Sequence, residues 1–333
     1  MARNKIRFGF FYDFRNPQQW RRPWADLYAE TLEFISWSES VGFEMAAVAE
    51  HHASDDGYIP SPLVAAAAIA ARTKTLRIGT ALAVAPLYHP VRFAEDCALI
   101  DILSNGRLDV AVGVGWRQRE MAAYGRNLET RGSYTEELIQ IVRSLWQGET
   151  VSANSKHFNI DTALVMPRPV QEHLPLYVGG FYPKALQRAA RHADGYQGYL
   201  DVYPAYIEQV RACGKDPAAA KFTMMNLAFY VARDPEKAFA EIGPHVLYTN
   251  NAYAKWQTEA EHDSQFQPMD MATLRASGTL TILTPQQAID YIEAALGRAS
   301  IDNFLTCPPA GMPMSKFAEY AELFAKEVIP AFR

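Results

Sequence analysis

The sequence predicts an α/β fold, a (β/α)8 barrel, from three observations. Apolar segments of strand length alternate with segments of helical spacing, eight strand-like segments are present, and the chain has 333 residues. Strands joined by helical crossovers form a parallel sheet, and a barrel of eight such units typically occupies about 250 residues and tolerates insertions. A doubly wound open sheet is the alternative. No linker rich in Pro, Gly or Ser divides the chain, so we expect one domain over residues 1–333.

The first half of the chain supplies four strand–helix units. Apolar runs predict the strands, and amphipathic or alanine-rich stretches predict the helices. Gly42 ends the first helix, and proline opens the second and third, where its fixed φ suits the first helical turn. The expected strands are 6–12, 45–49, 77–85 and 108–115, and the expected helices are 25–41, 62–73, 90–103 and 134–146.

The second half continues the pattern with one interruption. Thr284 is the expected N-cap of a helix that has proline at its first position. Residues 244–283 mix polar and aromatic side chains over a length that is unusual for a loop. We therefore expect an insertion before the last helix–strand unit, which is a lid or substrate-binding segment or is partly disordered. The expected strands are 176–180, 196–200, 222–232 and 302–306, and the expected helices are 184–192, 285–296 and 314–328.

Composition excludes several classes of protein. With a net charge of −5 and a pI near 5.9, the chain lacks the electrostatic signature of a protein that binds nucleic acid or an anionic membrane. No window approaches the roughly 18 consecutive apolar residues of a membrane span, and the N-terminus shows no signal-peptide pattern. Cys97, Cys213 and Cys307 form no metal-ligand or disulfide motif. We expect a cytoplasmic protein without a metal site.

Glu50, His51 and His52 follow the second expected strand directly. The carboxyl ends of barrel strands carry the chemistry of barrel enzymes, and a carboxylate beside an imidazole can move protons near neutral pH. A buried Glu–His pair without a catalytic role is the alternative. Adjacent histidines on a strand point to opposite faces, which argues against a shared metal ion.

Two glycine motifs end later strands. Gly113, Gly115 and Trp116 stand at the end of the fourth strand without the third glycine of a dinucleotide-binding fingerprint. They indicate either a backbone that lets a flat ligand approach closely or plain tight turns. Gly179 and Gly180 end the fifth strand before a helix start, where free N–H groups could bind an anion or where the glycines serve only the turn.

Taken in order, these residues resemble the bacterial-luciferase-like family of flavin-dependent monooxygenases, the LLM class of flavin-dependent oxidoreductases. The resemblance covers at least residues 6–200 and becomes general after about residue 210. The matching motifs are Glu50-His51-His52, Gly57-Tyr58-Ile59-Pro60-Ser61-Pro62, Gly79-Thr80-Ala81, His89-Pro90-Val91-Arg92, Ser104-Asn105-Gly106-Arg107, Gly113-Val114-Gly115-Trp116 and Val178-Gly179-Gly180.

The resemblance implies a homodimeric barrel that binds a reduced flavin at the carboxyl ends of its strands. One branch of the family takes reduced FMN from a separate reductase and uses O2, and the other uses the deazaflavin F-420 for hydride transfer. Catalysis by His51, with Glu50 beside the flavin ring, is implied, as is a non-prolyl cis peptide at Ala81–Leu82. The implied cofactor-binding residues are Ala81, Leu82, Gly113, Gly115, Trp116, Gly179, Gly180, Phe181, Tyr182 and Lys184.

The sequence departs from the family pattern where the flavin phosphate is expected. Val114 stands where the luciferase has an arginine, and Phe181-Tyr182-Pro183 stands where many relatives have serines. Proline donates no N–H, so the phosphate site is altered. Four cations are candidates for an anionic ligand, with Lys184 and Arg117 as substitutes at this site and Arg126 and Arg131 in the loop after the fourth strand.

We therefore expect a two-component monooxygenase that uses reduced FMN and O2 to oxygenate a small apolar organic substrate, with a flavin reductase as a transient partner. Glu50 would orient the flavin or the histidine. Tyr12, Trp116 and Tyr199 are expected as walls of an apolar cleft that excludes water. An F-420-dependent enzyme is the alternative within the family, and a non-catalytic flavin-binding protein of the same fold is the alternative from another class.

Overall fold

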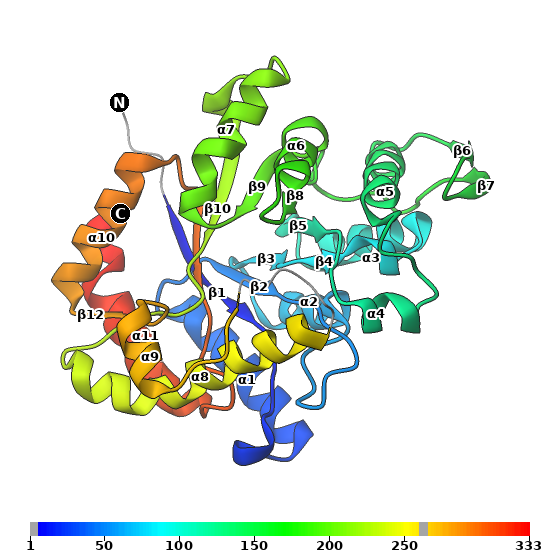
Figure 1. Cartoon of the computed structure of the whole chain (residues 1–333). Coiled ribbons are helices and arrows are strands. Elements are labelled where there is room, and N and C mark those ends of the chain that lie inside the picture. Colours follow the sequence, from blue (N-terminus) through cyan, green and yellow to red (C-terminus); the bar gives the residue numbers. More distant parts are fainter. Residues whose placement is uncertain (1–5, 260–265) are drawn as a thin grey trace.

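The structure is a computed structural model that describes residues 6–259 and 266–333. Parallel strands form a closed barrel that is wrapped by helices (Figure 1). Closure follows from the pairing, because β1 pairs with both β2 and β13 and β3 pairs with β5. The strands are β1 (Arg7–Tyr12), β2 (Met45–Val48), β3 (Arg77–Thr80) with β4 (Ala83–Val84), β5 (Leu108–Gly113), β8 (Leu176–Gly179), β9 (Gly195–Gly198), β10 (Lys221–Met225) and β13 (Asn303–Thr306).

β3 and β4 are the two halves of one strand, which is interrupted at Ala81 and Leu82. Counted in this way, the described residues form the eight-stranded parallel barrel that the sequence predicts, and the open sheet is excluded. The expected single strand over 77–85 is wrong only at this interruption. It occurs where the peptide bond between Ala81 and Leu82 is cis, as the family resemblance implied.

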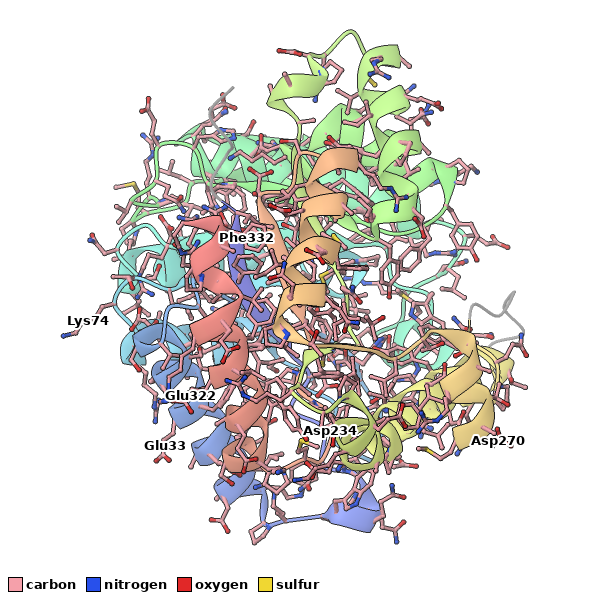
Figure 2. The ribbon with its side chains drawn as sticks, turned by 90° about the vertical axis from the view of Figure 1, so that its left-hand side faces the viewer. Glu33, Lys74, Asp234, Asp270, Glu322 and Phe332 are labelled. Atoms are coloured by element: carbon pink, nitrogen blue, oxygen red, sulfur yellow. The ribbon has the colours of Figure 1, made fainter. Side chains whose placement is uncertain are left out.

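Helices cover the outside of the barrel (Figures 1 and 2). Figure 2 shows α10 and α11 side by side on one flank, with Lys74, Glu33 and Asp270 pointing away from the protein. The short α4 (Gln118–Ala123) follows β5, and α7 lies in a stretch for which the sequence predicted no helix. The barrel helices are α1 (Trp24–Ser40), α2 (Pro62–Arg72), α3 (Pro90–Leu103), α5 (Arg131–Trp146), α6 (Pro183–His192), α7 (Tyr203–Ala212), α10 (Pro285–Arg298) and α11 (Met314–Glu327).

The alternation of side chains along β1 separates the helix-facing core from the barrel interior. Phe10 and Tyr12 pack against the Phe34 ring of α1, and Phe10 also contacts Phe317 of α11. Successive side chains of a strand point to opposite faces. Phe11, between them, therefore points into the barrel. The expectation that Tyr12 forms a wall of the cleft is wrong by one residue, because Tyr12 lies on the helix side.

The expected strand over 222–232 is two strands. β10 belongs to the barrel, whereas β11 (Phe229–Val231) leaves it and pairs in parallel with β12 (Thr281–Leu283). A turn at Leu227 and Ala228 separates the two strands. An apolar run does not reveal such a turn when the turn residues are themselves apolar. The structure also contains an antiparallel hairpin, β6 (Val151–Asn154) and β7 (Asn159–Ala163), that the sequence analysis did not predict.

The described parts of residues 244–283 are mostly helical. α8 (Pro235–Glu259) runs through Pro244, and α9 (Met271–Ser277) and β12 follow it. Ala238, Ile242 and Val246 are buried at four-residue spacing, so packing holds the helix across the proline despite the lost hydrogen bond. Residue 244 therefore lies inside a helix, and the role of 244–283 as a lid or insertion stays a prediction. Part of the expected insertion, residues 260–265, lies outside the described residues.

Within the described ranges, none of the helices combines the length and the apolar character that a membrane crossing requires.

Candidate active site

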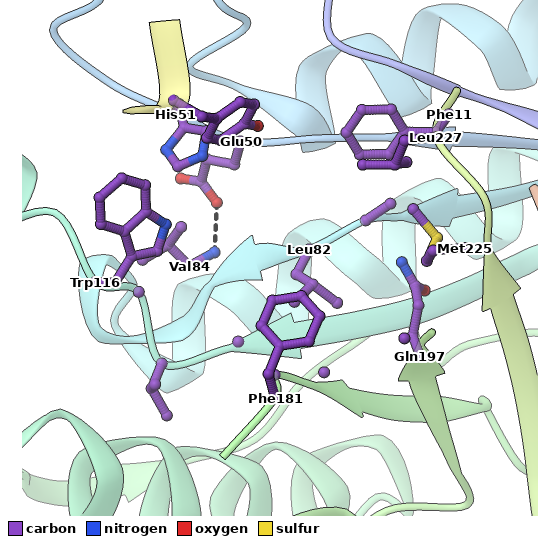
Figure 3. Close-up of a pocket in the computed structure, with 18 of the residues that line it drawn as sticks. Phe11, Glu50, His51, Leu82, Val84, Trp116, Phe181, Gln197, Met225 and Leu227 are labelled. Carbon is purple, nitrogen blue, oxygen red and sulfur yellow. Dashed lines mark hydrogen bonds between the residues drawn. The ribbon is translucent and has the colours of Figure 1, made fainter. Parts of the chain in front are cut away.

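A cavity of about 250 Å³ opens at the carboxyl ends of the barrel strands (Figure 3). Figure 3 shows His51 and Trp116 at one side of this cavity, Met225 and Leu227 at the other, and Leu82 between them. Of the catalytic and cofactor-binding residues that the family resemblance implies, all except Lys184 line the cavity. The predicted residues that line it are Glu50, His51, Ala81, Leu82, Gly113, Gly115, Trp116, Gly179, Gly180, Phe181 and Tyr182.

The floor of the cavity is an apolar side chain laid across two glycines. A Cβ on Gly113 would lie 2.9 Å from Leu82 Cδ1, and a Cβ on Gly179 would lie 2.7 Å from the same atom. Gly115 has φ +67°, a conformation in which side-chain-bearing residues are rarely found. Gly113 and Gly179 therefore let the Leu82 side chain pack directly against the ends of β5 and β8. The floor that results suits the face of a planar ligand, which is the first of the two readings that the glycine motifs allowed.

His51 and His52 have different environments, as their alternation along the chain predicts. His51 lines the cavity. The His51 ring lies 4.7 Å from the ring of Tyr58, 5.3 Å from that of Trp256 and 5.7 Å from that of Tyr253. His52 is not among the lining residues. An imidazole inside an aromatic enclosure is the only histidine of the pair that can reach a bound ligand.

Glu120 holds the His51 ring. Glu120 Oε1 lies 2.7 Å from His51 Nδ1, and the same oxygen accepts hydrogen bonds from the backbone N–H of His52 (2.9 Å) and from Arg117 Nη1 (2.9 Å). Burial alone would raise the pKa of this carboxyl, but hydrogen bonding and charge from His51 and Arg117 outweigh it and hold the pKa below its usual value. An ionised Glu120 accepts a hydrogen bond from the Nδ1–H of His51 and leaves Nε2 as the nitrogen that is available for chemistry.

Glu50 serves the other histidine and the broken strand. Glu50 Oε1 lies 2.8 Å from His52 Nε2, while Oε2 accepts hydrogen bonds from the Val84 N–H (2.6 Å; dashed in Figure 3) and from the Tyr88 hydroxyl (3.0 Å). Burial raises the pKa of Glu50 despite these hydrogen bonds, which lower it. His52 Nδ1 is in turn 3.0 Å from the Tyr124 hydroxyl. Glu50 thus orients His52 and fixes β4, and the carboxylate that orients His51 is Glu120.

The sequence predicted a lid or substrate-binding segment over 244–283 but did not identify which of its residues line the cavity. Tyr253, Gln257 and the following Phe266 line the cavity. The rings of Tyr253 and Phe266 stack at 5.0 Å with an interplanar angle of 22°. Their position within a mixed polar and aromatic stretch was the available signal, but helical spacing alone does not say which face meets the barrel. The other lining residues that were not predicted are Phe11, Tyr58, Val84, Gln197, Gly198, Met225 and Leu227.

The candidate cations occupy different places. Arg131 lines the cavity, and burial and the nearby Arg188 guanidinium both lower the pKa of Arg131. Lys184 is exposed on the first turn of α6 and does not line the cavity. Arg117 is 3% exposed and is bound to Glu120 and to the carbonyl of His52. Arg117 therefore does not reach the position expected for a phosphate. The Arg126 guanidinium packs over the Tyr134 ring at 4.8 Å.

Among residues 6–259 and 266–333, no group of three or more His, Cys, Asp or Glu side chains is arranged to hold a metal ion.

Comparison with known proteins agrees with this geometry. The family model described as luciferase-like monooxygenase matches residues 6–302. The chain is 26% identical over 332 residues to the oxygenase component of the flavin-dependent trigonelline monooxygenase of Acinetobacter baylyi, which covers 92% of this chain and 90% of that protein. The chain spans about half the length of several other curated relatives that it matches.

Two solved structures illustrate the shared fold. Monooxygenase RslO1 from Streptomyces bottropensis superposes with a TM-score of 0.85 at 23% identity, over 98% of this chain and 100% of that one. An F420-dependent secondary alcohol dehydrogenase, bound to an F420-acetone adduct, superposes with a TM-score of 0.75 at 22% identity, over 99% of both chains.

Proposed function

The chain belongs to the luciferase-like monooxygenase family, and from that premise we propose that it is the oxygenase component of a two-component system. It takes reduced FMN from a separate flavin reductase and uses O2 to oxygenate a small apolar organic substrate. The relative from Acinetobacter baylyi, matched over nearly its whole length, is named as such an oxygenase component. That likeness supports the division of labour between an oxygenase and a reductase.

The observation that carries the proposal is His51, fixed by Glu120, above a flat apolar floor. The absence of a Cβ on Gly113 and Gly179 makes room for the Leu82 side chain, which gives the cavity an apolar floor, so the residues present fit a flavin ring. Ala81, Leu82, Gly113 and Gly179 would hold the ring face, with Gly115 and Trp116 at its edge. Reduced FMN, when bound, supplies the electrons that activate O2.

The side chains of this protein perform the proton chemistry and exclude water. His51 Nε2 donates a proton to the activated oxygen or recovers it, while Glu120 keeps the proton on Nδ1 and so fixes the tautomer. The rings of Tyr58, Trp116 and Tyr253 around His51 keep bulk water from the reacting atoms. Glu50 acts through His52 and Val84 and is a positioning residue in this proposal.

The phosphate of FMN is assigned to the cavity mouth. Arg131 lines the cavity beside Tyr182, and the nearby Arg188 has its own partner, Glu136, at 3.0 Å. A bound anion offsets the repulsion between two neighbouring guanidinium groups. α6 begins at Pro183, so the positive end of its helix dipole lies next to Tyr182. In this proposal Arg131 takes the role of the arginine that the luciferase has on its fourth strand, where this chain has Val114.

α8 and Phe266 form the substrate-facing wall in this proposal, the role that the sequence analysis gave to the 244–283 segment. The wall is aromatic, with Tyr253 stacked on Phe266. An aromatic wall favours an apolar or planar organic substrate.

A homodimer remains part of the proposal. Val64 on α2 and Leu99 and Leu103 on α3 are exposed (72%, 47% and 60%), and the two helices contact each other. An apolar surface of this kind favours association with a second copy. Light scattering on the purified protein tests the dimer, and a Leu103→Lys variant that stays dimeric would exclude this face.

Hydride transfer with F-420 is the second candidate, and the superposition with an F420-dependent secondary alcohol dehydrogenase favours it. His51 would then donate or accept the substrate proton beside the hydride. The cofactor that binds when reduced distinguishes the two candidates.

The test of the proposal is the single-turnover reaction of enzyme-bound reduced FMN with O2 in wild type, His51→Asn and His173→Asn. His173 is an exposed histidine, 2.9 Å from Asp194 and outside the cavity, and serves as the matched control. We expect His51→Asn to slow reoxidation or shift it to H2O2 release by at least about tenfold, within the range of proton-transfer catalysis, and His173→Asn to match wild type. Equal kinetics in all three proteins would overturn the role of His51.

A further inference from the structure

Trp256 of α8 connects the substrate-facing wall to the buried charges beneath His51. It is 9% exposed and packs against two buried guanidinium groups. The Arg117 Cζ lies 4.1 Å from the Trp256 ring centroid, and the Arg15 Cζ lies 5.1 Å from it. Each arginine also contacts a carboxylate, since Arg117 Nη1 lies 2.9 Å from Glu120 and Arg15 Nε lies 2.6 Å from Asp56.

The contact with Arg117 has consequences for the catalytic imidazole. Arg117 has few ways to be stabilised, because its side chain is only 4% exposed. The Arg117 guanidinium packs on the Trp256 ring and donates hydrogen bonds to the His52 carbonyl and to Glu120 Oε1. The same Glu120 oxygen accepts the hydrogen bond from His51 Nδ1. The ring of Trp256 therefore packs on the Arg117 cation. Arg117 holds the Glu120 carboxylate, and Glu120 in turn holds the His51 ring.

Three further contacts dock α8 at this place. Tyr248 donates a hydrogen bond to Asp56 (2.8 Å), Tyr253 donates one to the Tyr58 hydroxyl (3.1 Å), and the Trp256 ring lies 5.3 Å from the His51 ring. These contacts place Trp256 in the same position whether or not its stacking on Arg117 matters. A purely structural role for Trp256 is the competing explanation.

We propose that Trp256 is a positioning residue, which through its stacking on Arg117 locks the Arg117–Glu120–His51 chain and so orients the His51 imidazole when α8 is docked. The consequence for catalysis rests on the proposed function, in which His51 handles the proton. The effect of Trp256 on the orientation of the His51 ring does not rest on that function, because it concerns contacts within this chain alone. The position of the substrate-facing wall and the orientation of His51 are in this way coupled.

The experiment observes the His51 ring directly, without flavin. In protein labelled with ¹⁵N-histidine, the Nδ1 proton held between His51 and Glu120 gives an imidazole N–H signal, which the His51→Asn variant identifies by its loss. We expect Trp256→Leu, which removes the π face, to broaden this signal and to speed its exchange with water roughly tenfold or more, as the loss of a desolvated cation–π contact implies. Trp256→Phe, which keeps a smaller ring, should have an intermediate effect.

Phe239→Leu is the matched control. Phe239 lies on the same helix, and the Arg275 Cζ lies 4.0 Å from its ring centroid, but Arg275 pairs with Glu236 on the surface and does not line the cavity. The control should leave the His51 signal as in wild type. Arg117→Lys keeps the charge without the planar face and should loosen the signal as Trp256→Leu does, which supplies the answer if Trp256→Leu fails to fold.

Unchanged His51 signals in folded Trp256→Leu and Arg117→Lys would overturn the proposal, even if both variants are less stable than wild type. Loosened signals in a protein that does not react with O2 would support the positioning role while the proposed monooxygenase function fails.

Discussion

Replacement of Glu120 by Gln tests the buried charges under the catalytic imidazole. The substitution keeps the shape of the side chain but removes the negative charge beside Arg117 and His51. Glu120 is fully buried, and the Arg117 side chain is 4% exposed. Loss of one partner from a buried ion pair costs about 3–5 kcal/mol of stability. Because the Gln oxygen can still accept the backbone N–H of His52, we expect the lower end, about 3 kcal/mol.

The assay is urea denaturation at several pH values, with Glu236→Gln as the matched control. Glu236 pairs with Arg275 at 2.8 Å on the surface, so its removal should cost at most about 1 kcal/mol. The pKa of Glu120 is lower in the folded protein than usual. Its contribution is therefore present above the unfolded pKa of about 4.3 and is lost as pH falls through the folded value. The difference between wild type and Glu120→Gln should shrink below about pH 4.

Two results would refute this reasoning. One is a Glu120→Gln protein that loses no more stability at pH 7 than Glu236→Gln does. The other is a stability difference between wild type and Glu120→Gln that stays constant from pH 7 to pH 3.

Three further predictions concern the floor, the mouth and the back of the site. Gly179→Ala places a Cβ 2.7 Å from Leu82 Cδ1 and 2.9 Å from the Gln197 carbonyl oxygen. We therefore expect this variant to lose about 1–3 kcal/mol of stability and to bind reduced FMN more weakly. Unchanged flavin titrations would contradict the assignment of the floor. Arg131→Met should weaken FMN binding by about 10- to 100-fold, the worth of a charge-assisted hydrogen bond, and leave riboflavin binding unchanged, whereas an equal loss for both ligands in fluorescence titrations would place the phosphate elsewhere. Burial, more than any other cause, raises the pKa of Asp13 from 3.8 to about 6. This raised pKa gives stability that is present below about pH 4 and is lost as pH rises through about 6, so Asp13→Asn should be about 3 kcal/mol more stable than wild type at pH 7 and equal to it near pH 4 in urea denaturation; a constant difference would count against this.

Most of the barrel could be predicted because its signals are local. Periodicity and the Pro and Gly boundaries locate α3 at Pro90–Leu103 and most other elements within one to three residues of the observed bounds. The failures have physical causes. Apolar turn residues conceal the end of β10, and tertiary packing carries α8 through Pro244, which a local rule treats as a helix terminator.

The site was predictable to the extent that its residues lie in strand-end motifs. His51, Leu82 and the glycines follow strands, and a closed barrel brings all its strand ends together. Glu120 could not be paired with His51 from the sequence, because 69 residues separate them and neither spacing nor composition reports such a contact. The sequence suggested that Glu50 orients the flavin or the histidine; the structure pairs Glu50 with His52 instead of His51, and its place beside a flavin stays a prediction. Trp256 was likewise out of reach, since its role depends on how α8 docks.

The measurement that tests the central claim most directly is an anaerobic titration of the purified protein with reduced FMN and, in parallel, with reduced F-420, followed by rapid mixing with O2. We predict saturable binding of reduced FMN and a transient absorbance, distinct from that of oxidised flavin, after O2 is added. Binding of reduced F-420 alone, with no transient on exposure to O2, would contradict the monooxygenase account and assign the cavity to hydride transfer.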